Sequence, residues 1–140
     1  MKTKIWAEFI INKFPMKHEE LTKLLEIVPT KAENAGDTLF HPNGKSYVLK
    51  HSSWTLDSGC KSNVGFSTPI VTLLEKIRPK KDRFVKMCEK YTLFLNVVIH
   101  IYGDERPYIG WESKIMKELA EYNASWGIDL SVYKENEWVE

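Results

Sequence analysis

The chain has 140 residues, of which 43% are hydrophobic, 12% aromatic and 28% charged, a composition typical of one soluble globular domain. Its 20 basic and 19 acidic residues leave a net charge of +1, too small to steer it strongly towards nucleic acid. Two cysteines exclude a disulfide framework, and no apolar run is long enough to cross a bilayer. We therefore expect one domain over residues 1–140, in the cytoplasm, with no membrane partner.

The first elements are a strand and a helix. Residues 5–11 alternate apolar side chains on one side with Trp6, Glu8 and Ile10 on the other, and this period of two predicts a strand. Over residues 16–28 the leucines recur every three or four positions up to a proline, which predicts a helix that buries one stripe.

A loop region and an extended strand follow. Residues 30–45 lack a sustained period and contain a Pro-Asn-Gly turn at 42–44, so they predict a long loop or a small hairpin. The segment 46–49 is expected to continue as a strand through Trp54 and Leu56, with a bulge near residues 52–53.

The second half repeats the strand and helix patterns. Thr68 precedes a proline and an apolar stripe, which predicts a helix start. A second helix is expected from Asp82 to Tyr91. The long β-branched run 93–102 predicts a strand, and a further helix and strand follow within 115–133.

This order suggests two strand-helix-strand units joined by helices. We expect an α+β fold, a ferredoxin-like sandwich of two βαβ-type halves with a mostly antiparallel sheet and helices on one face. The expected core side chains are Ala7, Phe9, Ile11, Trp54, Leu56, Leu95, Val97, Ile99, Ile128, Leu130 and Val132.

Five segments carry a resemblance to a known family. They are IVPTK at 27–31, GD at 36–37, SWTLDS at 53–58, LLEKIRPKK at 73–81 and GIDLSVY at 127–133. In this order and spacing they resemble the bacterial family known as domain of unknown function 4279. The resemblance implies an α+β domain and carries no established activity, catalytic residue or ligand.

The sheet face without helices is the candidate functional surface. It mixes aromatic with polar side chains, as surfaces that meet a partner or form a concave ligand site do. The alternative is that the loop 30–45 or a second copy covers it. The candidate binding residues are Trp6, Glu8, Trp54, Asn96, His100, Tyr102, Asp129 and Tyr133.

The sequence lacks the motifs of catalysis and metal binding. Its four histidines have no metal-ligand spacing, and it contains no phosphate loop or nucleophile elbow. No cofactor is expected. His100 with Glu8 or Asp129 can form an acid/base pair across neighbouring strands. The alternative is that His100 is an ordinary half-buried strand residue whose ring nitrogens find hydrogen bonds. Because Glu8 and Asp129 share the open face, RNA binding is disfavoured.

A run of basic residues surrounds a proline after the Thr68 helix. Such a run can meet a phosphate or an acidic protein, and it can also stabilise the helix end through the helix dipole. The run, called the basic turn below, consists of Lys76, Arg78, Lys80, Lys81 and Arg83.

Three functions fit these observations. The preferred hypothesis is a non-enzymatic binding module with a protein partner, by analogy with small bacterial immunity or accessory proteins. The second is a small-molecule or hydrolytic pocket built from Trp54, His100, Asp129 and Tyr133. The third is a homodimer through the open face, which Tyr102→Glu would convert to monomers.

Overall fold

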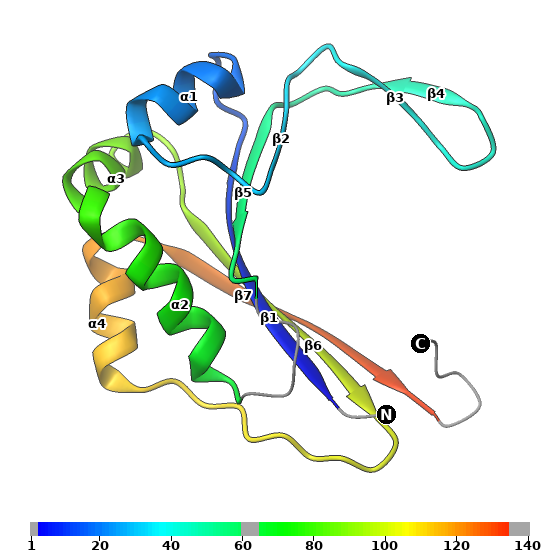
Figure 1. Ribbon diagram of the computed structural model, residues 1–140, viewed down its shortest axis with the longest axis vertical. Helices are drawn as coiled ribbons and strands as arrows, with labels where there is room; N and C mark the ends of the chain where they lie inside the picture. Colours follow the sequence, from blue (N-terminus) through cyan, green and yellow to red (C-terminus); the bar gives the residue numbers. More distant parts are fainter. Residues whose placement is uncertain (1–2, 60–64, 135–140) are drawn as a thin grey trace.

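The computed structural model describes residues 3–59 and 65–134, which form a five-stranded sheet with helices on one face and a separate hairpin (Figure 1). The elements are β1 (Lys4–Asn12), α1 (His18–Leu25), β2 (Lys31–Glu33), β3 (Thr38–Phe40), β4 (Ser46–Val48), β5 (Ser53–Asp57), α2 (Ser67–Ile77), the 3-10 turn η1 (Arg78–Lys80), α3 (Lys81–Cys88), β6 (Phe94–Tyr102), α4 (Ser113–Glu121) and β7 (Ser125–Tyr133). No described helix has both the length and the apolar character needed to cross a membrane.

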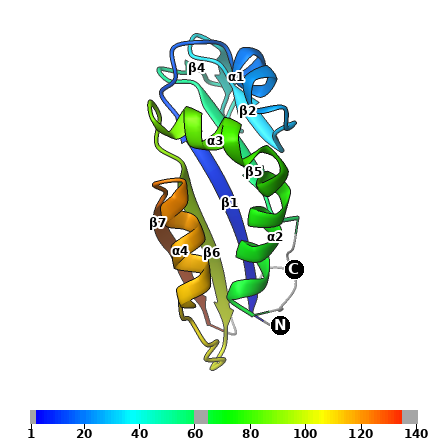
Figure 2. The same cartoon turned by 90° about the vertical axis from the view of Figure 1, so that its left-hand side faces the viewer.

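The sheet order is β2-β5-β1-β6-β7, and all neighbours are antiparallel except β6 and β7. Because β5 is antiparallel to both β1 and β2, the β1-α1-β2 unit is a split βαβ unit with β5 between its strands. In the same way, β5 and β6 are parallel with β1 between them. The predicted α+β class and mostly antiparallel sheet are confirmed, with all helices on one face (Figure 2).

The first unit closes on a strand that the sequence did not predict. We expected the Trp54 segment to close it, but the three-residue β2 does so, and β5 opens the second unit instead. The expected continuous strand from residue 46 to Leu56 is also wrong, since β4 pairs with β3 in a separate two-stranded sheet. The turn at 42–44 does form this hairpin, with Gly44 at a φ of 86° that suits glycine.

The core lies between the sheet and the helices (Figure 2). Trp54 is fully buried there, its indole N–H donates to Oγ1 of Thr22 at 3.2 Å, and the ring of Phe84 meets it edge-on at 6.1 Å. Leu56 is 5% exposed beside it. The prediction that Trp54 and Leu56 anchor the core is therefore confirmed, and burying such an aromatic side chain is a large stabilising contribution.

The last strand departs from the predicted core. Ile128, Leu130 and Val132 lie on the helix side of β7, but they are 37%, 51% and 60% exposed. The prediction that they are buried is wrong because β7 is an edge strand, so its side chains have strand neighbours on one side alone. Trp126, on the same side of β7, is 50% exposed.

The basic turn is committed to contacts within the domain. Arg78 donates from Nε and NH2 to both oxygens of Glu118, at 2.9 and 2.8 Å, and this fork lowers the pKa of Glu118. Lys80 and Arg83 both pair with Glu26. Of the other two residues, Lys81 pairs with Glu121, and Lys76 Nζ donates a hydrogen bond to the Asp57 carbonyl oxygen. The basic turn thus ties the helices to one another and to β5.

Candidate functional site

The open face is the side of the sheet away from the helices, towards which the β3–β4 hairpin projects at one end (Figure 1). Strand alternation places the side chains opposite the buried ones on this face. Most of them are partly exposed, so the hairpin does not bury the face. From β2, β5, β1, β6 and β7 it presents Lys31, Thr55, Asp57, Lys4, Trp6, Glu8, Ile10, Phe94, Asn96, Val98, His100, Tyr102, Asp129, Ser131 and Tyr133.

An aromatic cluster occupies one end of the open face. The ring of His100 lies 4.8 Å from the ring of Trp6 and 5.3 Å from that of Tyr133, both in edge-on geometry. Tyr133 in turn stacks on Tyr102 at 5.1 Å. Three neighbouring strands therefore supply one continuous aromatic surface, which we call the aromatic cluster (Trp6, His100, Tyr102 and Tyr133).

Three carboxylates lie next to this cluster. Glu8 pairs with Asp57 across the β1–β5 register, and Asp129 lies on β7, two strands away. Partial burial is the main cause that raises the pKa of Glu8, and the charges of Asp57 and Asp129 raise it further. A hydrogen bond from Trp6 and the positive charge of Lys31 act in the opposite direction. Among the described residues no basic group lies within 4.0 Å of these carboxylates.

The structure brings together seven of the eight predicted binding residues. Trp54 is the exception, because it is buried on the opposite side of the sheet. A pocket that includes both Trp54 and His100 therefore cannot form, and this prediction is wrong. Tyr102 is on the expected face but is only 5% exposed beneath its neighbours. The seven residues are Trp6, Glu8, Asn96, His100, Tyr102, Asp129 and Tyr133.

The open face has no assembled acid/base pair in the described residues. No carboxylate oxygen of Glu8 or Asp129 lies within 4.0 Å of His100, which stands opposite Lys4 and Ser131 in the strand registers. Over residues 3–59 and 65–134 there is also no group of three or more side chains suited to a metal ion. The face therefore offers an aromatic surface with three carboxylates beside it, and the lysines of the same face are Lys4 on β1 and Lys31 on β2.

Sequence reasoning missed Asp57 as part of the site. The signal was present, because Asp57 follows Trp54 and Leu56 with odd spacing and so must point away from the core.

The thiol of Cys88 has its pKa raised to about 11 by burial, which removes it as a reactive group at neutral pH. Cys60 lies outside the described residues.

Comparison with known proteins gives a family and no named relative. No curated protein and no solved structure matches the chain. The model of one family, described as a domain of unknown function (DUF4279), matches residues 1–133. The match covers nearly the whole chain, and the chain therefore belongs to the DUF4279 family.

Proposed function

We propose that this protein is a non-enzymatic binding module that holds a protein partner on the open face. The observation that carries the proposal is the aromatic cluster beside three carboxylates, none of which forms an ion pair within 4.0 Å among the described residues. Aromatic residues are enriched where protein surfaces meet partners. A face with no further role would instead carry the charged and polar side chains of a solvated sheet surface.

The chemistry of the face favours a basic segment of the partner. An arginine or lysine side chain can lie on the rings of Trp6 and Tyr133 through a cation–π contact. Its charge would also offset the repulsion from Asp57 and Asp129, which adds to the effect of burial in raising the pKa of Glu8. A guanidinium group can in addition donate two hydrogen bonds to one carboxylate, which gives the contact a defined geometry.

A peptide titration tests this proposal. The probe is acetyl-Ala-Arg-Ala-Arg-Ala-amide, its counterpart has glutamate in place of arginine, and calorimetry measures both affinities. We expect the arginine peptide to bind more tightly, and Trp6→Ala to weaken it at least tenfold. The matched control is Trp126→Ala, since Trp126 is half exposed on the other side of the sheet. Equal affinity for both peptides, or equal losses in both variants, contradicts the proposal.

The finer form of the proposal is an immunity-like or accessory role in the bacterial cytoplasm. It rests on analogy with small proteins that neutralise the product of a neighbouring gene. The identity of the neighbouring genes tests it, because a toxin or defence gene beside this one is the expected arrangement.

We also infer that the domain is a ferredoxin-like sandwich enlarged by the β3–β4 hairpin and the α4–β7 unit. The two split units share the sheet, since β5 lies between β1 and β2 and β1 lies between β5 and β6, and this arrangement supports the inference.

A homodimer through the β7 edge is a second candidate. The exposed stripe Trp126, Ile128, Leu130 and Val132 lies on a nine-residue edge strand whose outer backbone groups pair with no other strand of the described residues. A long apolar edge of this kind is a template for pairing with another strand. Two β7 strands centred on Leu130 would place Ile128 of each copy opposite Val132 of the other, so the surface is self-complementary.

Sedimentation at several concentrations tests the dimer. We expect the mean mass of the wild type to rise from the monomer value towards the dimer value as the concentration increases. We expect the Leu130→Glu variant to keep the monomer mass at every concentration. The control is Val48→Glu, at a site on the hairpin that is 60% exposed. A wild-type protein that stays monomeric at its highest soluble concentration contradicts this candidate. The variant Tyr102→Glu cannot serve here, because Tyr102 is buried and its replacement would test folding.

A further inference from the structure

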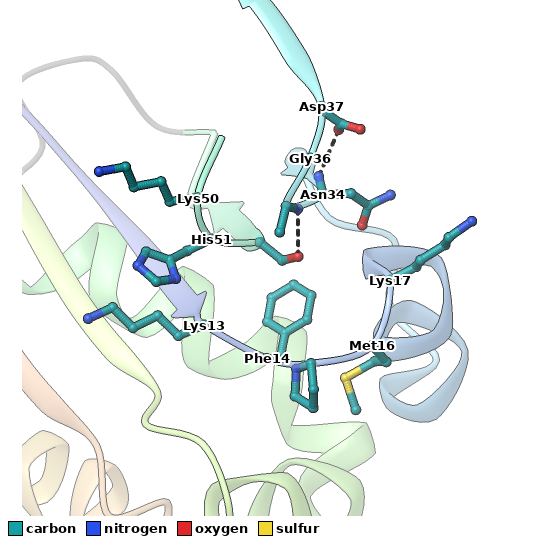
Figure 3. A pocket seen from close by; sticks show the side chains of 12 residues that line it. Lys13, Phe14, Met16, Lys17, Asn34, Gly36, Asp37, Lys50 and His51 are labelled. Carbon is teal, nitrogen blue, oxygen red and sulfur yellow. Dashed lines mark hydrogen bonds between the residues drawn. The ribbon is translucent and has the colours of Figure 1, made fainter. Parts of the chain in front are cut away.

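A cavity of about 420 Å³ lies where β1 ends, away from the aromatic cluster. Its walls come from residues 13–17, 34–37 and 50–52, three segments that are distant in the sequence. Figure 3 shows Lys13, Lys50 and His51 along one side and Lys17 on the opposite side, with the ring of Phe14 between them. We call these four basic side chains and the space between them the basic pocket. Its volume is within the range of small-molecule sites.

Within residues 3–59 and 65–134 the lysines of the basic pocket form no ion pair. No carboxylate lies within 4.0 Å of Lys13, Lys17 or Lys50 among the described residues. Asp37 is the one acidic residue of the walls, and its carboxylate accepts the backbone N–H of Asn34 at 2.8 Å. The basic turn provides the contrast, because four of its five side chains are ion-paired within the domain. Uncompensated positive charge therefore collects in the pocket.

The floor of the basic pocket is built from buried groups. Phe14 is 3% exposed and gives the pocket an apolar surface. Ser52 is 4% exposed; its Oγ accepts the backbone N–H of Ala35 at 2.9 Å, so its hydroxyl proton can be donated to a ligand. The Ser52 carbonyl oxygen accepts the backbone N–H of Lys13 at 3.0 Å, which fixes the two walls together.

The backbone at Lys13 is strained. Its φ is 60°, in the left-handed region that a residue with a long side chain rarely adopts. Such a conformation costs on the order of 1 kcal/mol or more and is found preferentially at functional sites. Here it turns the chain out of β1 at the point where the Lys13 side chain meets the cavity (Figure 3).

We propose that the basic pocket is a second binding site, which takes a small phosphate monoester attached to an aromatic or apolar body. Lys13, Lys50 and His51, which lie on one side of the pocket, would hold the dianionic phosphate, with the Ser52 hydroxyl as a further donor. The apolar body would lie on Phe14 and Met16. This site is separate from the open face and does not depend on the function proposed for it.

Binding of phenyl phosphate tests the proposal, with phenol and inorganic phosphate as comparison ligands. Calorimetry should give the tightest binding for phenyl phosphate, weaker binding for inorganic phosphate and none for phenol. The double variant Lys13→Gln/Lys50→Gln should weaken phenyl phosphate at least tenfold. Its matched control is Lys86→Gln/Lys117→Gln, which removes two exposed lysines on the helices. Trp6→Ala should bind phenyl phosphate as the wild type does, which separates this site from the open face.

Three results would overturn the proposal. The first is no measurable binding of phenyl phosphate to the wild type. The second is an equal loss in the pocket variant and the control variant, which would mean attraction by overall charge. The third is equal affinity for phenyl phosphate and inorganic phosphate, which would remove the apolar part of the site. A thermal unfolding curve of each variant verifies that the domain is folded, and Lys50→Gln alone, at an exposed position, serves if the double variant unfolds.

Discussion

The two faces of the sheet both carry a tryptophan, but one of these residues stabilises the core and the other is part of the candidate binding surface. On the helix side, Trp54 is fully buried and its indole N–H is bonded to Thr22. On the open face, Trp6 is partly exposed and lies between His100 and a carboxylate whose pKa is raised. The difference teaches that aromatic content alone does not mark a site in this protein. The candidate site is distinguished by aromatic side chains next to carboxylates that form no ion pair among the described residues.

The largest expected effect is on the helix side. Trp54→Ala should lower the free energy of unfolding by roughly 3–5 kcal/mol, since it leaves a cavity and removes a buried hydrogen bond. That is a large part of the stability of a domain of this size. Urea denaturation measures it, with Trp6→Ala as the matched control on the open face. Equal losses in the two variants would erase the distinction between the faces.

A smaller effect of opposite sign is expected at Tyr122. This residue is fully buried, and its hydroxyl oxygen has no hydrogen-bond partner among the described residues. Burial, with the nearby Glu118 carboxylate, raises its pKa to about 12. Removing an unsatisfied buried hydroxyl should therefore stabilise the domain by about 1 kcal/mol in Tyr122→Phe. A loss of stability in urea denaturation would mean that the hydroxyl is bonded in solution.

The smallest stability effect is expected on the open face, in Glu8→Gln. The raised pKa of Glu8 means that the folded state disfavours the ionised carboxylate. The variant should thus be more stable at neutral pH, by less than about 1 kcal/mol because solvent screens the half-exposed group. The gain should vanish as the pH falls below the ordinary pKa of a carboxyl group, where Glu8 is protonated in both states. Unfolding curves at pH 7 and pH 3.5 measure this, and a gain that is the same at both would contradict it.

The strands in the middle of the sheet could be predicted from the sequence because they are long and have the helix layer over one face. The alternation in β1 and β6 assigns the core side chains correctly, including Phe9, Leu95 and Val97, but it does not show that Val98 and Tyr102 on the opposite face are buried as well. The edges could not be predicted in this way. Three-residue β2 is too short to show a period, and β7 carries an apolar stripe that only an internal position would bury.

The candidate sites were predictable to different degrees for the same reason. The open face follows from strand alternation, so seven of its residues could be named from the sequence. The basic pocket depends on where the chain leaves β1 and where it returns before β5, and this brings Lys13 beside Lys50 (Figure 3). The basic turn stands out in the sequence, yet its partners Glu26 and Glu118 are far away in the chain. The cluster of basic residues in the sequence therefore drew attention to the basic turn, where the fold pairs most of the positive charges with carboxylates.

The most direct measurement is an NMR titration of the folded protein with the arginine peptide, in which the chemical shifts of the backbone amides and of the tryptophan indole N–H groups are followed. If the open face is the binding surface, the chemical shifts of Trp6, Glu8, Asn96, His100 and Tyr133 should change, while those of Trp54 and of the helices should change little. Shifts confined to the helix layer or to the β7 stripe, or shifts of the same size with the glutamate peptide, would contradict the assignment of the open face as the binding surface.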